Sequence, residues 1–335
     1  MALKALPRSS KVLLCALFAF TTIIFILKVN IYRFVVDDTL TFHDILVPFV
    51  QLIPRYTLFH PWVLVTAIFA EISVFPFILS TLVLYTSTKY VEKFWGYKEV
   101  IKFVILIGSI TNLWTVLVTI LCNIFREDVE GMDKPLGGGI SYYFGFLVVL
   151  KQLIPEHNIL LFNGMVNFRV KQFPFILLLV VLAISLIMGT LYPFLPSIGS
   201  FVVSFLYLRF YQTFTIDPLL PITTLDGIEE GSASASSGSV ITGDASDTFQ
   251  LVEFFPSITK PYLGYVFDKI YELGVFLGAV TPFNDELIEQ GNMRVRKRQE
   301  QTNQVLKSVA NSVAERRRQV ALQVIEERIS KESKK

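Results

Sequence analysis

The chain has 335 residues, of which 53% are hydrophobic and only 17% are charged, and its formal net charge is +2. Soluble domains carry about 25% charged residues, so this composition excludes an ordinary soluble protein and indicates a membrane protein. The small net charge is no evidence for or against a nucleic-acid partner, and we expect none. The only two cysteines, Cys15 and Cys122, lie too far apart to form a disulfide framework.

Six long apolar segments occupy the part of the chain before Asp217. A helix that crosses the hydrocarbon core of a bilayer needs about 20 apolar residues, and its backbone groups must bond to one another in lipid. We therefore predict an all-α, polytopic membrane domain over residues 1–217. The predicted spans are Val12–Val29, Trp62–Thr86, Val100–Ile124, the short Gly138–Leu150, Phe173–Tyr192 and Ser197–Tyr211.

Lysine and arginine residues gather on one side of these segments, which predicts the cytosolic side. With six spans, both termini then face the cytosol, and the loops Asn30–Pro61 and Arg126–Leu136 face the lumen or exterior. The apolar stretch Ile45–Val50 predicts that the first of these loops lies in the membrane interface. The basic side contains Lys4, Arg8, Lys11, Lys89, Lys93, Lys98, Lys151, Arg169, Lys171 and Arg209.

The composition changes after Asp217. Residues 218–247 are rich in serine and glycine and predict a flexible linker. Residues 248–290 predict an amphipathic, membrane-proximal segment, because apolar residues recur at helical spacing among charged ones between Phe249 and Val280. Such a helix either lies on the bilayer surface or packs under the membrane domain. Its apolar positions are Leu263, Val266, Phe267, Ile270, Leu273 and Leu277.

Residues 291–335 predict a charged, helical, cytosolic tail. Its first part is a basic cluster of the kind that attracts anionic lipid head groups. Its last part places small and branched apolar residues on one helical face next to three arginines, which suits docking to a partner helix or groove. A solvated helix is the alternative. The candidate lipid-contacting residues are Arg294, Arg296, Lys297 and Arg298, and the candidate partner-binding residues are Arg316, Arg317, Arg318, Ala321, Ile325 and Ile329, with Ala314 on the same face.

Several short motifs carry a resemblance to a known family. The short fourth segment opens on three glycines, Gly137 to Gly139, and Glu92 and Gly96 form a Glu-x-x-x-Gly pattern after the second span, as in rhomboids. Four further motifs, in this order, resemble the eukaryotic transmembrane protein 115 family: Gly145-Phe146 with Leu150–Gln152, Tyr207–Gln212, Phe254–Pro256 and Ala314–Gln323. The resemblance covers most of the chain, and it assigns structural roles to Glu92, Gly96 and Gly145.

The resemblance implies a six-helix rhomboid-like bundle in the Golgi membrane that has lost protease activity. It also implies a role in Golgi-to-endoplasmic-reticulum retrograde transport and Golgi organisation, with Golgi tethering or vesicle-coat machinery, membrane lipids and membrane-protein clients as partners. A derlin-like role in quality control of membrane proteins, in the endoplasmic reticulum or Golgi, is the alternative. A homo-oligomer is left open, and no cofactor or metal is expected.

The residues themselves argue against a protease. A rhomboid protease carries Gly-x-Ser-Gly at the start of its fourth helix, whereas Ser141 here is followed by Tyr142. The sixth segment contains no histidine to act as base, and Pro76 and Ser80 stand where a protease has its oxyanion donors. Removal of one triad member alone costs a rate factor of about 10⁴. We therefore predict no catalytic residue, with Ser141 as a helix-packing residue.

Glu71 is the one carboxylate placed inside a predicted span. A carboxylate in that position is a candidate functional group. The other interpretation places it at the lumenal interface, near Arg55 or His60, where it is solvated, and the sequence favours that solvated position. A transporter would need further polar groups near the midplane and an inverted repeat, neither of which the sequence offers.

Overall fold

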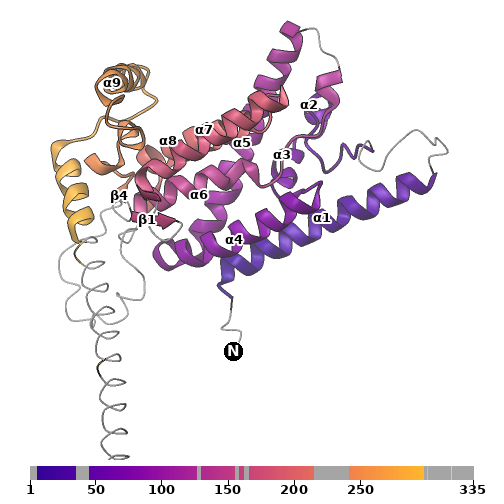
Figure 1. The fold of residues 1–335 in the computed structure, drawn as a ribbon, viewed down its shortest axis with the longest axis horizontal. Helices are drawn as coiled ribbons and strands as arrows, with labels where there is room; N and C mark the ends of the chain where they lie inside the picture. The colour runs from indigo at the N-terminus through magenta and orange to yellow at the C-terminus, as the bar shows by residue number, and fades with distance from the viewer. Residues whose placement is uncertain are drawn as a thin grey trace, which may run out of the picture.

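The computed structural model describes residues 6–34, 45–126, 130–154, 158–161, 166–214 and 241–297, together with positions 300 and 318. Five described helices are long and apolar enough to cross a membrane (Figure 1). They are α1 (Arg8–Phe34), α4 (Val74–Trp95), α5 (Tyr97–Arg126), α7 (Phe173–Met188), which η4 (Val170–Gln172) extends, and α8 (Phe194–Leu206), which continues into the π-helix η5 (Tyr207–Tyr211). A shorter apolar helix, α6 (Ile140–Leu153), packs within the bundle. The predicted helical, polytopic membrane fold is therefore confirmed, with five candidate spans and this shorter helix among the described residues.

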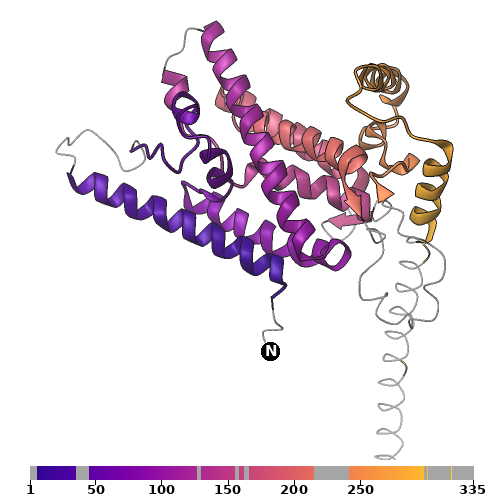
Figure 2. The same ribbon diagram turned by 180° about the vertical axis from the view of Figure 1, so that it is seen from behind.

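Helix α6 lies inside the bundle and packs mainly against α8 and α5 (Figures 1 and 2). Ten of its 14 residues are buried. Gly145 permits the close approach to α8, because a Cβ atom at this position would lie 2.7 Å from Ser204 Oγ. Its backbone N–H donates to Ser200 Oγ over 3.1 Å. Small residues at a helix interface allow this kind of packing in membranes, where lipid offers no hydrophobic drive between helices.

The second predicted span, Trp62–Thr86, is wrong at both ends. Residues 62–73 form α3 (Val63–Thr66), the 3₁₀ turn η1 (Ala67–Phe69) and an irregular stretch, and the long helix α4 begins at Val74 and ends at Trp95. The 3₁₀ turn is held by the glycine-rich chain before α6, where the Gly138 N–H donates to the Ala67 carbonyl over 2.8 Å. Gly137 and Gly138 have φ of +101° and +89°, which side chains disfavour. A tertiary contact therefore interrupts the predicted helix, although this part of the sequence is almost uniformly apolar.

The loop before α3 packs into the protein. It contains α2 (Pro54–Thr57), and Leu52 pairs with Leu136, whose N–H donates to the Leu52 carbonyl over 2.7 Å. The 3₁₀ turn η2 (Glu130–Asp133) lies beside α2. In the stretch predicted to lie in the membrane interface, Ile45 and Val47 are buried, whereas Phe49 is exposed. Part of this stretch is therefore covered by protein.

Beyond α6, the described chain forms two short antiparallel ladders. Strand β1 (Asn158–Leu161) pairs with β2 (Val166–Arg169), with Asn158 opposite Arg169. Strand β3 (Thr213–Phe214) pairs with β4 (Ile241–Thr242) across the predicted linker, so the end of that linker is already paired.

The predicted amphipathic helix from Phe249 to Val280 is shorter than expected. Its first residues form the 3₁₀ turns η7 (Asp247–Phe249) and η8 (Leu251–Phe254), in which Phe249 and Phe254 are buried in the main core. The helix itself, α9, covers Lys260–Phe276. Pro256 lies between η8 and α9, and Pro261 occupies the first turn of α9, where its missing N–H has no helical partner to lose. A further helix covers residues 285–297.

Candidate functional site

The serine at the protease position is enclosed. Ser141 is fully buried at the start of α6, and its hydroxyl donates to the Gly138 carbonyl over 3.0 Å. Tyr142 fills the space beside it, with its ring edge-on to Phe146 at a centroid distance of 6.0 Å. This arrangement pairs the Ser141 hydroxyl with backbone and leaves it no water-filled approach.

The face of α8 that meets α6 carries three serines, in the segment where the sequence offers no histidine. Ser197, Ser200 and Ser204 are all fully buried. Ser197 Oγ donates to the Pro193 carbonyl over 2.9 Å, and Ser200 Oγ accepts from Gly145. The single histidine in the described ranges is His60, whose ring lies 4.8 Å from that of Phe49 and 5.0 Å from that of Trp62. His43 and His157 lie outside the described residues.

Glu71 is buried, which contradicts the expectation of a solvated carboxylate near Arg55 or His60. Its Oε1 accepts from the Gly139 N–H over 2.8 Å and from the Ser80 hydroxyl, and Ser80 also bonds to Tyr143 Oη over 2.6 Å. The irregular stretch before α4 turns this carboxylate inward, under the first turn of α6. Glu71 therefore joins α4 to α6 at the lumenal end of the predicted topology.

Glu92 and Gly96 lie together at the opposite end of the bundle. The Glu92 carboxylate accepts from the backbone N–H of Arg8 over 3.1 Å and of Ser9 over 2.9 Å, and from the Ser9 hydroxyl. It thus satisfies the free N–H groups at the start of α1 from a different helix. Gly96, at φ +78°, ends α4 and donates to the Glu92 carbonyl over 2.9 Å. The pair connects α1, α4 and α5.

Three of the motifs that carry the family resemblance meet at this same end of the bundle. We name residues 241–254 the docked segment, because they pack onto the ends of α6 and η5. Arg209 Nη1 donates to the carbonyls of Asp244 over 2.6 Å and Ser246 over 2.7 Å, and Gln152 Nε2 donates to Asp244 Oδ2 over 3.1 Å. Arg209 and Gln152 come from two motifs, and Phe254 from the third.

Lys151 lies beneath the docked segment and is 1% exposed. Its ammonium nitrogen lies 3.3 Å from the centroid of the Phe254 ring and 3.4 Å from the Gln250 carbonyl. A cation over an aromatic face gains electrostatic attraction, which grows when water is excluded. From the sequence, Lys151 and Arg209 indicate only the cytosolic side. Their shared role is missed because their partners follow about 35 to 100 residues later in the chain.

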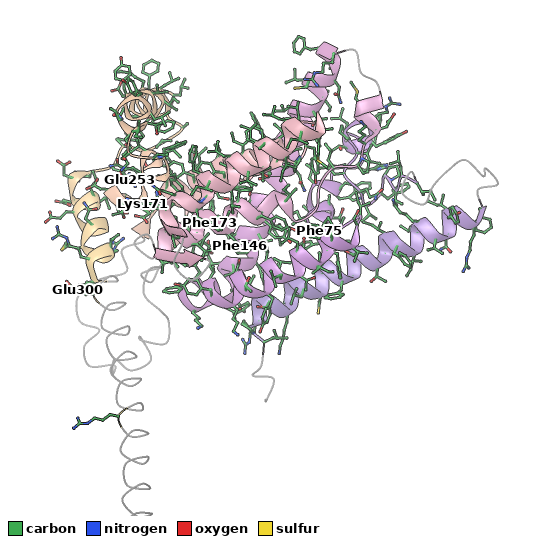
Figure 3. The ribbon with its side chains drawn as sticks, in the orientation of Figure 1. Phe75, Phe146, Lys171, Phe173, Glu253 and Glu300 are labelled. Atoms are coloured by element: carbon green, nitrogen blue, oxygen red, sulfur yellow. The ribbon has the colours of Figure 1, made fainter. Side chains whose placement is uncertain are left out.

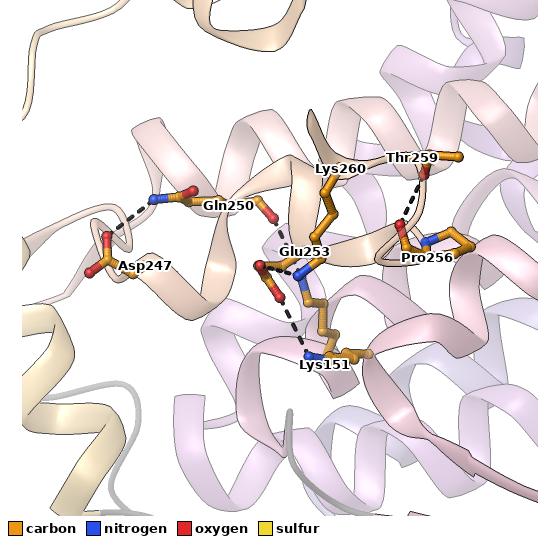
Figure 4. A network of polar contacts seen from close by, with 8 residues as sticks. Lys151, Asp247, Gln250, Glu253, Pro256, Thr259 and Lys260 are labelled. Carbon is orange, nitrogen blue, oxygen red and sulfur yellow. Dashed lines mark hydrogen bonds and ion pairs between the residues drawn. The ribbon is translucent and has the colours of Figure 1, made fainter. Parts of the chain in front are cut away.

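Glu253 connects the docked segment to α7 and α9. Its carboxylate bonds to Lys260 over 2.5 Å and to Lys171 over 3.5 Å (Figures 3 and 4). Burial by itself raises the pKa of Glu253, but the hydrogen bond and charge of Lys260, with those of Lys171, outweigh it and lower the pKa below its ordinary value.

A lowered pKa makes this contact weaken in acid. The stabilisation is fully present above the unfolded pKa of about 4.3 and is lost as the pH falls through the lower folded value. Because the Glu253 carboxylate is only partly buried and water screens the pair, we expect a loss of only about 0.5 kcal/mol. The distance distribution between spin labels on α7 and α9 should therefore broaden below that pH, and Glu253→Gln should show the broadened distribution at pH 7. If Glu253→Gln gave the same distance distribution as the native protein at pH 7, Glu253 would not hold α7 and α9 together.

The root of the tail is bonded to the docked segment. Asn292 Nδ2 donates to Asp247 Oδ2 over 2.7 Å, and Asn292 Oδ1 accepts from the Asp247 N–H over 3.0 Å. Val295 is buried, and a Cβ atom on Gly291 would lie 3.0 Å from the Ser246 nitrogen. Bundle, docked segment and helix 285–297 therefore form one continuous path of contacts.

The predicted tail sites are only partly described. Arg296 and Lys297 are exposed on helix 285–297, and Arg294 donates to Gln290 Oε1 over 3.5 Å. Arg318 is helical and exposed. The remaining candidates lie outside the described residues and stay predictions: Arg298, Arg316, Arg317, Ala321, Ile325 and Ile329. Where the structure describes the chain, no three His, Cys, Asp or Glu side chains form a group that could hold a metal ion.

Comparison with known proteins gives consistent matches. The family described as "Eukaryotic integral membrane protein (DUF1751)" matches residues 11–331. The Transmembrane protein 115 homolog of Saccharomyces cerevisiae is 32% identical over 335 residues, which cover 97% of this chain and 93% of that protein. Rhomboid-like protein 19 of Arabidopsis thaliana is 30% identical over 220 residues, 65% of this chain and 63% of that protein. No solved structure matches. The predicted membership of the transmembrane protein 115 family is thus confirmed, and the chain belongs to the Eukaryotic integral membrane protein (DUF1751) family.

Proposed function

We propose that this protein is a non-catalytic, rhomboid-like adaptor in Golgi-to-endoplasmic-reticulum retrograde vesicle transport and Golgi organisation. In this proposal it resides in the Golgi membrane with both termini in the cytosol. The family membership supports a multi-pass membrane protein with a rhomboid-like relative. The Golgi location and the transport role rest on the resemblance to the transmembrane protein 115 family.

The surroundings of Ser141 support the absence of catalysis. A serine nucleophile needs a base within hydrogen-bond reach and an opening for substrate. The Ser141 hydroxyl instead donates to the Gly138 carbonyl, and the facing positions of α8 are serines engaged in helix packing. A fluorophosphonate probe that labels the native protein and not Ser141→Ala would refute this part of the proposal.

The observation that carries the adaptor mechanism is the anchored root of the tail. Asn292 and Val295 attach helix 285–297 to the docked segment, and the docked segment is bonded to the bundle through Arg209. The bundle would set the location, and the tail would project from a fixed point. The face with Arg316, Arg317, Arg318, Ala321, Ile325 and Ile329 would then capture Golgi tethering or vesicle-coat machinery.

Truncation before residue 300 tests this mechanism and leaves Asn292 and Val295 in place. Proximity labelling from the C-terminus should lose tethering and coat proteins, and retrograde cargo should accumulate in the Golgi, while the truncated protein stays in the Golgi membrane. Ile325→Glu with Ile329→Glu should act like the truncation, whereas Glu327→Ala should act like the native chain. If partner capture were unchanged after truncation, the proposal that the tail binds the partner would be wrong. Normal cargo return together with slower turnover of misfolded membrane proteins would favour the derlin-like role instead.

A further inference from the structure

Helix α9 presents an apolar face that is uncovered by any described part of the chain. None of its residues is buried. Six large apolar side chains occupy positions related by three- and four-residue steps, so they form one stripe along the helix, within which Lys269 also falls. Their exposed fractions lie between 48% and 85%, and they are Tyr262, Tyr265, Val266, Ile270, Leu273 and Phe276. Exposed apolar surface on this scale marks an interaction site.

The opposite face fixes the orientation of α9. The Phe267 ring lies 5.6 Å from that of Phe255, and Tyr271 stacks against Phe210 at 6.1 Å and Phe283 at 6.4 Å. Tyr271 Oη also accepts from the Phe283 N–H over 3.1 Å. Because aromatic contacts to Phe255 and to η5 occupy this side, the apolar stripe faces away from them.

The position of α9 in the fold identifies what it meets. Phe255 packs against Phe175 of α7 as well as against Phe267, so α9 lies beside the first turn of a membrane span. Figure 1 views α9 along its own axis while α7 and α8 run across the picture, so α9 lies crosswise to the spans. The lipid-facing side of α7 is itself apolar and exposed at Leu179 and Val180. Helix α9 therefore lies at the level at which α7 begins, beside a span whose exposed side is apolar.

The charges of α9 indicate which part of the lipid it recognises. The helix carries two lysines, Lys260 and Lys269, and two acids, Asp268 and Glu272. Lys269 pairs with Glu272 over 2.6 Å, and Lys260 pairs with Glu253. Such a helix has no surplus positive charge for anionic head groups. Apolar burial at the boundary between head groups and acyl chains remains as its driving force.

We propose that α9 is an in-plane helix, seated at the interface of the membrane that the bundle crosses, whose ligand is the acyl-chain boundary of the lipid. It forms a lipid contact separate from the basic cluster at Arg294–Lys297. The two contacts differ in chemistry, because the basic cluster depends on anionic head groups and α9 does not.

Spin-label accessibility in the reconstituted full chain tests this proposal. In a Cys15→Ala, Cys122→Ala background, a nitroxide at Leu273 reports the stripe and one at Asp268 reports the polar flank. In phosphatidylcholine bilayers, collisions with oxygen should exceed those with a water-soluble nickel complex at 273, and the ratio should invert at 268. Phosphatidylserine should leave both ratios unchanged. Folding of the bundle is not at stake, because neither side chain is buried.

Three outcomes would overturn the proposal. A label at 273 that meets the nickel complex as freely as the label at 268 would place the stripe in water. Spin–spin broadening at 273 that grows with the number of chains per bilayer would assign the stripe to a second copy. An oxygen-rich signal that appears only with phosphatidylserine would assign the contact to head-group charge.

Discussion

Replacing Glu71 with alanine is expected to lower the free energy of unfolding by about 3 kcal/mol, whereas glutamine should lower it by less than about 1 kcal/mol. The alanine variant leaves the buried N–H of Gly139 without an acceptor and opens a cavity under α6. Both donors that reach Glu71 bond to its Oε1, and the amide oxygen of glutamine can accept from both. The comparison can be made by reversible unfolding in mixed micelles.

The pair of Glu71 variants separates hydrogen bonding from charge. Equal losses in the alanine and glutamine variants would mean that the negative charge matters and not the acceptor. An alanine variant as stable as the native chain would mean that water replaces the carboxylate, and the assigned link between α4 and α6 would be wrong. Glu99→Gln, at the opposite end of the bundle, serves as a matched control, because Lys102 and Tyr207 contact its carboxylate near the surface.

Sequence reasoning found the membrane helices because the bilayer imposes one simple requirement, a long apolar run with a self-satisfied backbone. It missed the break before α4 for the same reason. Residues 62–73 are as apolar as a span, apart from Glu71, and hydropathy has no signal for a contact with Gly138. The contact that ends the helical run comes from residues some 70 positions later.

The docked segment could not be predicted from the sequence, for a different reason. Asp244 and Ser246 follow a Ser/Gly-rich stretch whose composition predicts a flexible linker, and Gln152 bonds to Asp244 across 92 positions. Cations at the ends of apolar segments ordinarily face water, so Lys151 and Arg209 were used only to assign the cytosolic side of the membrane. One feature of the sequence could have indicated the docked segment. The motifs at Leu150–Gln152, Tyr207–Gln212 and Phe254–Pro256 occur together in one family, and in the fold these motifs lie close to one another.

Replacing Arg209 with methionine is expected to release the docked segment from the bundle at a cost of about 3 kcal/mol, roughly a hundredfold in the opening equilibrium. Methionine keeps the apolar stem but leaves the carbonyls of Asp244 and Ser246 without their donor and removes the cation from the Phe283 ring. Amide exchange of residues 243–254 should accelerate by that factor, while exchange in α5 and α6 should not change. Lys93→Met, at an exposed position, is the control.

Gly243→Ala reaches the same contact without touching the arginine. Gly243 has φ +69°, and a Cβ atom there would collide with the Arg209 backbone carbonyl, which cannot rotate away as a side chain can. If Arg209→Met and Gly243→Ala both accelerate exchange and both abolish partner capture while the tail is intact, the tail works only when it is held by the bundle. Accelerated exchange with normal capture would show that the tail acts as a free tether, and the anchored-root mechanism would then be wrong.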